Sequence, residues 1–206
     1  MGTTVPPDVI QFGHLDIAYD SRVGRPDPGS EAQARWARML LEHGPSGAVL
    51  SLYAGVGHVG LLTAAGTGRR LVLVEADEVA REYARFNASS AGMDATEVVG
   101  DLDDVGGHEF ALVLCGVERD SFGGLGGACA CIRAAEERLV PGGALVLALD
   151  DVTDVVELVE WLATRDRDLA VQEFLRPDGQ GVLAVLRATG RGAHGDGELP
   201  ADVVCS

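Results

Sequence analysis

The sequence predicts a doubly wound α/β fold, in which a mostly parallel sheet carries helices on both faces. Unbroken apolar segments typical of strands buried on both faces occur at residues 48–53, 70–75, 110–115 and 144–149. Amphipathic segments with helical spacing alternate with them, as expected for consecutive β-α units. Two further apolar segments, 169–175 and 182–187, flank a turn rich in Pro and Gly, which predicts an antiparallel hairpin.

The N-terminal part is expected to form a loose arm over residues 1–13 and a helix over residues 31–43. The helix is indicated by apolar residues at helical spacing, which are Ala34, Trp36, Ala37, Leu40 and Leu41. Ser30 is placed to cap its first turn, and Gly44-Pro45 ends it.

The strand at 48–53 runs into a glycine turn, Gly55-Val56-Gly57-His58-Val59-Gly60, which opens a helix over residues 58–65. The next strand, 70–75, ends in Glu75, at the distance from the turn that typifies nucleotide-binding α/β folds. We expect Gly55 to permit the tight turn, Gly57 to let a ligand approach the backbone, and Gly60 to let the helix pack on the strand. A carboxylate at Glu75 can accept hydrogen bonds from two ribose hydroxyls, so the segment predicts a nucleoside-type ligand.

The remaining elements follow the same alternation. We expect helices over residues 77–91, 128–139 and 154–164, and strands over residues 96–99, 110–115 and 144–149. Asp77 and Glu78 fall at the positive end of the first of these helices, and Gly92 at its C-terminal cap. Residues 141–143 predict a turn before the fifth strand. Residues 189–206 are polar and rich in Gly, and we expect them to be disordered.

Composition narrows the classes of protein to consider. At 206 residues the chain is expected to form one main domain. No apolar run is long enough to span a membrane, and the N-terminus lacks a secretory signal. The four cysteines lack the paired spacing of a zinc site, so we expect no metal and reduced thiols in a cytoplasmic protein.

Charge bears on the partners of the protein. The formal net charge of −16 lacks the positive surface that normally neutralises phosphates, which makes nucleic acid an unlikely partner. The simplest role of the acidic residues is solubility. The sequence gives no indication of the oligomeric state.

Several segments together resemble class I methyltransferases that depend on S-adenosylmethionine (SAM), which have a Rossmann-like, seven-stranded sheet ending in an antiparallel hairpin. Residues 52–57 resemble the first SAM motif of that family, residues 73–77 the second, and residues 100–102 the third. The resemblance implies that SAM is the cofactor. It also implies a set of cofactor-binding residues, namely Tyr53, Gly55, Gly57, Glu75, Ala76, Asp101, Leu102 and Cys115. It places the SAM-binding domain at residues 45–188, after an N-terminal arm and helix at residues 1–44 that could form a lid.

One position departs from the family. The first motif usually carries an acid near the end of its strand, where this chain has Ser51. In the family that acid helps to organise the methionine end of the cofactor. Its loss could weaken SAM binding, or a neighbouring residue could compensate for it.

A second, narrower resemblance lies upstream. Residues 22–31 are similar to the segment R-V-L-I-P-R-P-E-T-E of release-factor glutamine methyltransferases. Those enzymes also carry N-P-P-Y after the fourth strand, where this chain has Gly116-Val117-Glu118-Arg119. The missing motif speaks against their amide-clamping device. It leaves Arg22, Glu118 and Arg119 as candidate substrate-binding residues, with His58 either a base or a structural residue of the first helical turn.

Three functions remain open from the sequence. The first is transfer of a methyl group from SAM to a small-molecule or protein acceptor. The second is a catalytically degenerate protein of the same fold with a regulatory or scaffold role, which Ser51 and the missing N-P-P-Y favour. The third is a nicotinamide-dependent enzyme, which the predicted terminal hairpin opposes. No catalytic residue can be assigned, because methyl transfer depends mainly on positioning of the acceptor.

Overall fold

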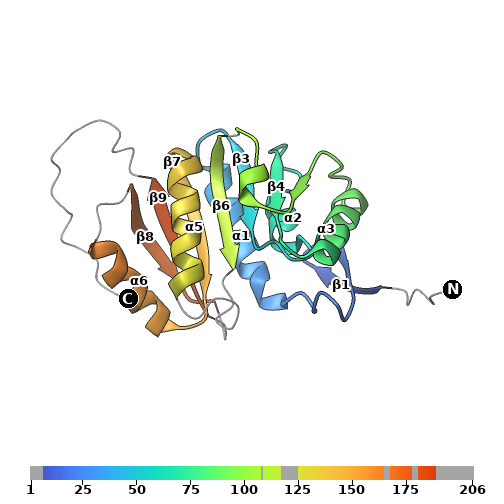
Figure 1. The fold of residues 1–206 in the computed structure, drawn as a ribbon, viewed down its shortest axis with the longest axis horizontal. Helices are drawn as coiled ribbons and strands as arrows, with labels where there is room; N and C mark the ends of the chain where they lie inside the picture. Colours follow the sequence, from blue (N-terminus) through green and yellow to red (C-terminus); the bar gives the residue numbers. More distant parts are fainter. Residues whose placement is uncertain (1–6, 108, 117–124, 165–167, 178–180, 189–206) are drawn as a thin grey trace.

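The computed structural model describes residues 7–107, 109–116, 125–164, 168–177 and 181–188 (Figure 1). In chain order, the elements of the first half of the chain are β1 (Asp8–Phe12), β2 (Leu15–Tyr19), η1 (Pro28–Ser30), α1 (Glu31–Glu42), β3 (Ala48–Leu52), α2 (His58–Ala64), β4 (Leu71–Val74), α3 (Glu78–Ser90), β5 (Glu97–Val99) and η2 (Leu102–Asp104). They are followed by β6 (Phe110–Gly116), α5 (Leu125–Arg138), β7 (Leu139–Leu149), α6 (Val152–Ala163), β8 (Leu169–Leu175) and β9 (Val182–Ala188).

The main sheet confirms the predicted fold class. Within the described ranges its seven strands lie in the order β5-β4-β3-β6-β7-β9-β8. The pairs from β5 to β7 are parallel, whereas β9 runs antiparallel to both β7 and β8, as the terminal hairpin predicts. The chain order reverses between β3 and β6, so the carboxyl ends of these strands border the crevice where such sheets bind ligands.

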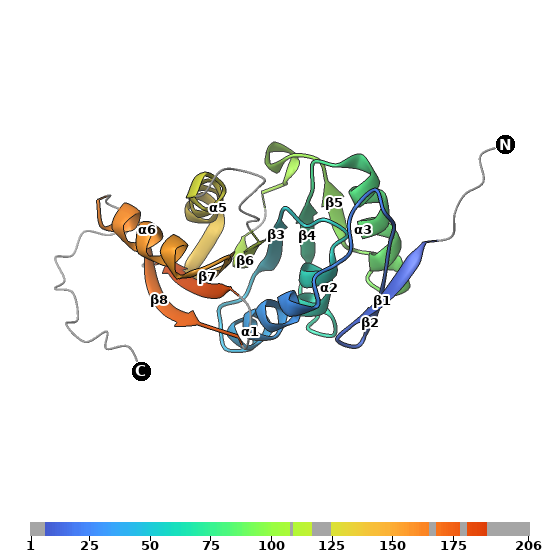
Figure 2. The same ribbon diagram turned by 90° about the horizontal axis from the view of Figure 1, so that it is seen from below.

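Two apolar layers hold the sheet between its helices. Residues that alternate along each strand point to opposite faces, so Val49 packs with α1, α2 and α3, while Leu50 packs with α5 and α6. Figure 2 shows α1 and α2 on one side of the sheet and α5 and α6 on the other. This double coverage explains why the central strands read as continuous apolar runs in the sequence.

Several boundaries differ from the sequence prediction by a few residues, and two of them have a clear physical reason. The side chain of Asp77 caps α3 from outside the helix, accepting a hydrogen bond from the amide of Ala80 at 2.7 Å. Residues 141–143, expected to form a turn, lie within β7, where the pairing with β6 is irregular and Gly142 has a φ of 77°. A glycine accommodates that conformation without strain, which lets the strand continue through the irregularity.

The first residues of the described chain form a β-hairpin, where the sequence predicted a loose arm. Strands β1 and β2 pair antiparallel as a separate two-stranded sheet. Phe12 and Ile17 are fully buried, and the ring of Phe12 meets that of His58 edge to face, with centroids 4.9 Å apart. The amide of Gly13, in the turn, donates to the carboxylate of Glu31 at the start of α1 and lowers the pKa of that carboxyl.

A fully buried amide fastens this hairpin to the body of the protein. The side chain of Asn87 on α3 accepts from the backbone N–H of Ala18 at 2.8 Å and donates to the carbonyl of Ala18 at 3.0 Å. It also donates to the carbonyl of Val56 in the glycine turn, at 3.0 Å. One side chain thus joins β2, α3 and the glycine turn.

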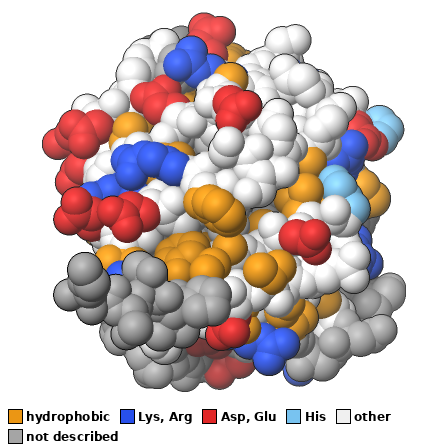
Figure 3. All heavy atoms as spheres, turned by 90° about the vertical axis from the view of Figure 1, so that its right-hand side faces the viewer, with side chains coloured by type: hydrophobic (Ala, Val, Ile, Leu, Met, Phe, Trp, Pro, Cys, Tyr) orange, Lys and Arg blue, Asp and Glu red, His pale blue; other side chains and the backbone are white. Residues whose placement is uncertain are grey.

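The surface over β1 and α3 carries charged and hydrophobic side chains side by side (Figure 3). Figure 3 shows acidic and basic side chains interspersed there, with hydrophobic ones gathered between them. The exposed hydrophobic residues of β1 and α3 are Val9 and Phe86. None of the described helices is both long and apolar enough to cross a membrane.

Replacing Asn87 by alanine should destabilise the fold, because it leaves buried backbone groups of Ala18 and Val56 without partners. We expect the free energy of unfolding to fall by about 2–4 kcal/mol, measured by urea denaturation. Ser90→Ala, an exposed change on the same helix, should shift it by less than about 0.5 kcal/mol. Equal midpoints for Asn87→Ala and the wild type would contradict the role of this amide.

Burial of His58 should make stability sensitive to mild acid. Desolvation lowers the pKa of His58 to about 4, against 6.5 for a free imidazole, and the nearby Asp27 offsets this only in part. Above pH 6.5 the ring is neutral in both the folded and the unfolded chain. As the pH falls toward 4 the unfolded chain takes up a proton that the folded chain does not. We therefore expect a loss of about 2 kcal/mol at pH 5 relative to pH 7.5.

The variant His58→Phe keeps the ring contact with Phe12 and removes the titration. It should lose correspondingly less stability between pH 7.5 and pH 5 in urea denaturation. His14→Gln, at the exposed hairpin turn, should behave as the wild type. An identical pH dependence in His58→Phe and the wild type would show that this imidazole is not held neutral.

Candidate functional site

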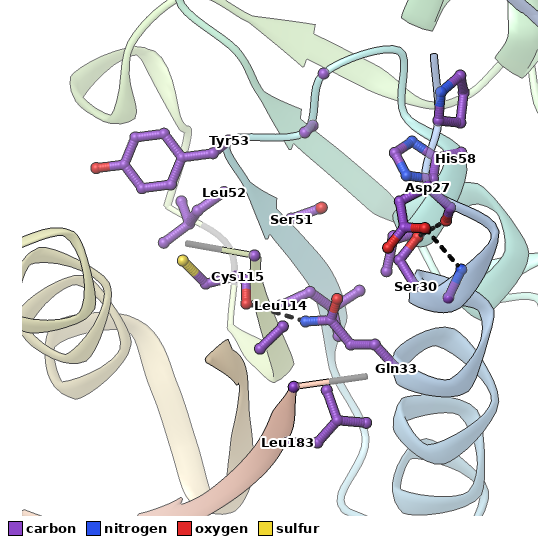
Figure 4. Close-up of a pocket in the computed structure, with 18 of the residues that line it drawn as sticks. Asp27, Ser30, Gln33, Ser51, Leu52, Tyr53, His58, Leu114, Cys115 and Leu183 are labelled. Carbon is purple, nitrogen blue, oxygen red and sulfur yellow. Dashed lines mark hydrogen bonds between the residues drawn. The ribbon is translucent and has the colours of Figure 1, made fainter. Parts of the chain in front are cut away.

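A cleft of about 550 Å³ opens over the carboxyl ends of β3, β6 and β7 (Figure 4). Its walls are the segment Val23–Ser30, which precedes and enters η1, the glycine turn after β3, and the ends of β6 and β7. Pro177 and the start of β9 close the remaining side. Its volume falls within the range of sites for small organic ligands. The described structure therefore places a ligand-sized cleft at the reversal of strand order.

The glycines of the turn have different surroundings. Gly55 has a φ of 53°, and a side chain built on it would meet no atom within 4 Å. A Cβ on Gly57 would lie 2.9 Å from a δ-carbon of Leu73 and 3.3 Å from one of Leu61, both in the core. The open glycine that lines the cleft is Gly55, whereas a side chain on Gly57 would meet the core, so packing alone already requires a glycine at position 57. A Cβ on Gly60 would lie 2.7 Å from Cδ2 of Leu73, so a glycine there lets the helix pack closely on the strand.

Tyr53 marks the entrance to this turn. Its φ of 51° is unusual for a residue other than glycine, and 42 % of its surface is exposed. In Figure 4 its ring extends to the side of the cleft opposite His58. Strained backbone of this kind is often kept at ligand sites, where the surrounding structure holds it in place.

The carboxylate of Glu75 is held at the glycine turn. One oxygen accepts from the amide of Gly55 at 2.7 Å, and the other accepts from the amide of Asp77 at 2.9 Å. These bonds fix the side chain beyond the end of β4, beside the open glycine. The predicted pairing of the glycine turn with an acid is thus present as a direct hydrogen bond.

The other predicted cofactor residues continue along the same edge of the sheet. Ala76 follows Glu75, and Asp101 and Leu102 follow β5. The carboxylate of Asp101 caps the short η2 helix by accepting from the amide of Asp103 at 3.0 Å. Of the predicted set, Tyr53, Gly55 and Cys115 line the cleft, whereas Gly57, Glu75, Ala76, Asp101 and Leu102 are not among its lining residues.

Cys115 lies near the end of β6. Its backbone carbonyl contacts α1 on one face of the sheet, and its side chain contacts α5 on the other. Its carbonyl accepts a hydrogen bond at 3.0 Å from the side-chain amide of Gln33, which also reaches the carbonyl of Val146 on β7 at 3.3 Å. Gln33 is 2 % exposed and lines the cleft, yet the sequence reading did not single it out. The available signal was its helical spacing with Ala37 and Leu41, which places this polar residue on the buried face of α1.

The sulfur of Cys115 is bonded to Cys131 on α5, with Cα atoms 6.6 Å apart. The sequence expectation of reduced thiols is therefore wrong for this pair. The spacing of the cysteines gave no sign of it, because the two residues are brought together only by packing of α5 against β6. Cys129, on the same helix, is buried and is not part of this disulfide.

Of the candidate substrate residues, Arg22 is the one that lies within the described part of the chain. Arg22 binds the carboxylate of Asp20, with Nη2 2.6 Å from Oδ2, and Tyr83 on α3 donates to the same oxygen at 2.8 Å. The hydrogen bonds from Arg22 lower the pKa of Asp20 to about 2. Arg22 is not among the residues that line the cleft, which begin at Val23. Glu118 and Arg119 lie outside the described residues.

His58 stands on the wall formed by the glycine turn. Figure 4 shows it beside Asp27, and within the described part of the chain its buried Nδ1 has no hydrogen-bond partner. Burial lowers the pKa of His58 to about 4, so the imidazole is a weak base near neutral pH. Across the described ranges, no group of three or more His, Cys, Asp or Glu is arranged to hold a metal ion.

The comparisons with known proteins agree with this geometry. Residues 23–164 match the family described as methyltransferase small domain. The structure is similar to the ribosomal protein L11 methylase from Lactobacillus delbrueckii subsp. bulgaricus, with a TM-score of 0.66, 14 % identity, and coverage of 79 % of this chain and 80 % of that one. No curated protein matches the sequence.

Two other similar structures contain S-adenosylhomocysteine. One is an RNA methyltransferase from Salinibacter ruber, with a TM-score of 0.56, 20 % identity, and coverage of 87 % of this chain and 98 % of that one. The other is the tRNA (uracil-54, C5)-methyltransferase of Pyrococcus abyssi, with a TM-score of 0.61, 20 % identity, and coverage of 88 % and 44 %.

These neighbours correct one expectation. The acidic balance of the sequence suggested that nucleic acid is an unlikely partner, yet chains of this architecture include RNA methyltransferases. Net charge describes the whole chain and not the surface around one cleft, so it cannot exclude a class of acceptor here.

The matched residues cover more than half of the chain and include α1, the glycine turn, Glu75 and the ends of β6 and β7. The fold, the order of the strands and the cleft at their carboxyl ends are those expected for this family. The chain belongs to the methyltransferase small domain family and is a SAM-dependent methyltransferase with a Rossmann-like fold.

Proposed function

We propose that SAM binds along the carboxyl edge of the sheet, with Glu75 accepting hydrogen bonds from its ribose and Asp101 and Leu102 contacting its base. The residues present fit this cofactor. Gly55 leaves open space beside the cleft, and the carboxylate of Glu75 is already held against it. Tyr53, Ala76 and Cys115 complete the proposed set, with Gly57 supporting the turn from the core side.

SAM supplies a methyl group bound to a positively charged sulfur. The chain has to hold an acceptor atom in line with that methyl and to limit access of water. The segment Val23–Ser30 supports this role, because it forms one wall of the cleft and is anchored at both ends, by the hairpin and by α1. We accordingly propose that the N-terminal region, residues 1–44, contributes a cover to the site through Val23–Ser30, and that residues 45–188 form the cofactor-binding domain.

The acceptor proposed here is a small molecule or a protein side chain. It would enter over β6 and β7, on the side of the cleft away from the glycine turn. Gly116, Asp150 and Gly181 line that side, so it combines small residues with an acid. Such a wall favours a neutral or amine-bearing group. The observation that carries the proposal is the cleft itself, which spans the strand ends on both sides of the order reversal.

Replacing Glu75 by glutamine should weaken cofactor binding. Gln retains one acceptor oxygen for the turn but loses the charge and the second strong acceptor, and unpaired ribose hydroxyls cost about 1–3 kcal/mol. We expect calorimetric titration with S-adenosylhomocysteine to show a Kd raised about tenfold to a hundredfold. Glu78→Gln, an exposed acid in the first turn of α3, should bind as the wild type does. A folded Glu75→Gln protein with an unchanged Kd would refute the assignment.

The acceptor class can be tested with SAM labelled on its methyl group. Purified protein is incubated with separate fractions of small metabolites, proteins and RNA, with the Glu75→Gln variant as the control of reduced binding. We expect label in the metabolite or protein fraction. Label confined to RNA would overturn the proposed acceptor. Binding of SAM without transfer to any fraction would support the alternative of a degenerate regulatory or scaffold protein.

A further inference from the structure

The end of the cleft under α2 lacks the charge that its ligand requires. Ser51 lies on β3, lines the cleft and is 4 % exposed, and it occupies the position of the acid in the SAM motif that this segment resembles. Its Cβ is enclosed by the helix that follows the turn, 3.1 Å from where a Cβ on Gly60 would lie. A hydroxyl can accept a hydrogen bond from an ammonium group but cannot balance its charge. Taking an unbalanced ammonium out of water is costly.

Two acids line the cleft within the described residues, Asp27 and Asp150. Figure 4 shows the side chain of Ser51 pointing toward the wall on which Asp27 and His58 lie. Asp150 follows β7, which is separated from β3 by β6, so it lies about 10 Å farther across the sheet. Asp27 is therefore the acid placed to serve the end of the cleft at Ser51.

The local structure presents Asp27 in a fixed position. One carboxylate oxygen accepts from the amide of Gly29 at 3.0 Å, and its carbonyl accepts from the Oγ of Ser30 at 2.7 Å. Pro26 and Pro28 restrict the backbone on either side. Within the described part of the chain the carboxylate takes no other hydrogen bond, which leaves an oxygen for a ligand.

The neighbouring groups leave that oxygen accessible to a cation. His58 stays neutral because of its burial, so it provides no competing positive charge. Arg25 also lines the cleft but forms no ion pair with Asp27 among the described residues. The segment R-V-L-I-P-R-P-E-T-E has a basic residue where this chain has Asp27. This chain thus carries Ser at position 51, where the first SAM motif has an acid, and an acid at position 27.

We propose that the carboxylate of Asp27 binds the ammonium group at the methionine end of the cofactor, in place of the missing acid at Ser51. The proposal rests on the proposed SAM site. In this arrangement the negative charge that balances the ammonium group lies on the segment Val23–Ser30, which forms a wall of the cleft, and not on β3. Asp27 is then a binding residue that selects a cofactor with an intact amino-acid end.

The test compares two ligands in calorimetric titrations. S-adenosylhomocysteine carries the amino-acid end, and 5′-methylthioadenosine lacks it. The variant Asp27→Asn removes the charge while keeping the turn, because Asn accepts the same bond from Gly29. We expect it to raise the Kd of S-adenosylhomocysteine about tenfold or more and to leave that of 5′-methylthioadenosine unchanged.

Matched variants separate this role from others. Asp16→Asn removes the same charge on the exposed side of β2 and should leave both Kd values unchanged. Glu75→Gln should weaken both ligands, because both contain the ribose. Adding Ser51→Asp to Asp27→Asn should restore S-adenosylhomocysteine binding if the double variant melts like the wild type.

The outcomes are distinguishable. Equal weakening of both ligands by Asp27→Asn would show that Asp27 shapes the wall and does not bind the ammonium. An unchanged Kd for S-adenosylhomocysteine would likewise overturn the proposal. A wild-type protein that binds neither ligand would instead refute the proposed cofactor site, whatever the role of Asp27.

Discussion

The buried amide of Asn87 determines where one wall of the cleft lies. It uses both of its polar atoms to hold β2 against α3 and the carbonyl of Val56 against the same helix. The chain leaving β2 is then fixed by the contacts among Asp20, Arg22 and Tyr83 before it enters the segment Val23–Ser30. The glycine turn and the segment that covers it are therefore aligned through one side chain, so the cleft between them has a defined width.

The sequence indicated the central sheet because burial on both faces leaves a simple pattern, an unbroken apolar run bounded by turn residues. The hairpin of β1 and β2 has no such pattern. In β1 only Phe12 is buried, and the hydrogen bonds that hold β2 come from a residue 69 positions away. Local composition cannot report contacts that exist only once α3 has packed, so this segment was predicted as a loose arm.

In the candidate site, too, some features could be predicted from the sequence and others depend on packing. The pairing of the glycine turn with Glu75 was predictable because both lie at the ends of adjacent parallel strands. The separate roles of Gly55 and Gly57 were not, since they depend on which face of the turn meets Leu73 and Leu61. Gln33 shows the same limit, because its partners are carbonyls of β6 and β7, far away in the sequence. Motif spacing can suggest which residues lie near a site, but it does not show which side of the backbone faces the cleft and which faces the core.

The bond between Cys115 and Cys131 has a chemical consequence for a protein that handles an alkylating cofactor. A thiolate is a soft nucleophile, and one facing the cleft would compete with any acceptor for the methyl group. The sulfur of Cys115 is instead committed to α5, behind the sheet, and the residue presents to the cleft side a carbonyl already bound by Gln33. Cys115 therefore presents no thiolate at the end of β6 that could take the methyl group in place of an acceptor.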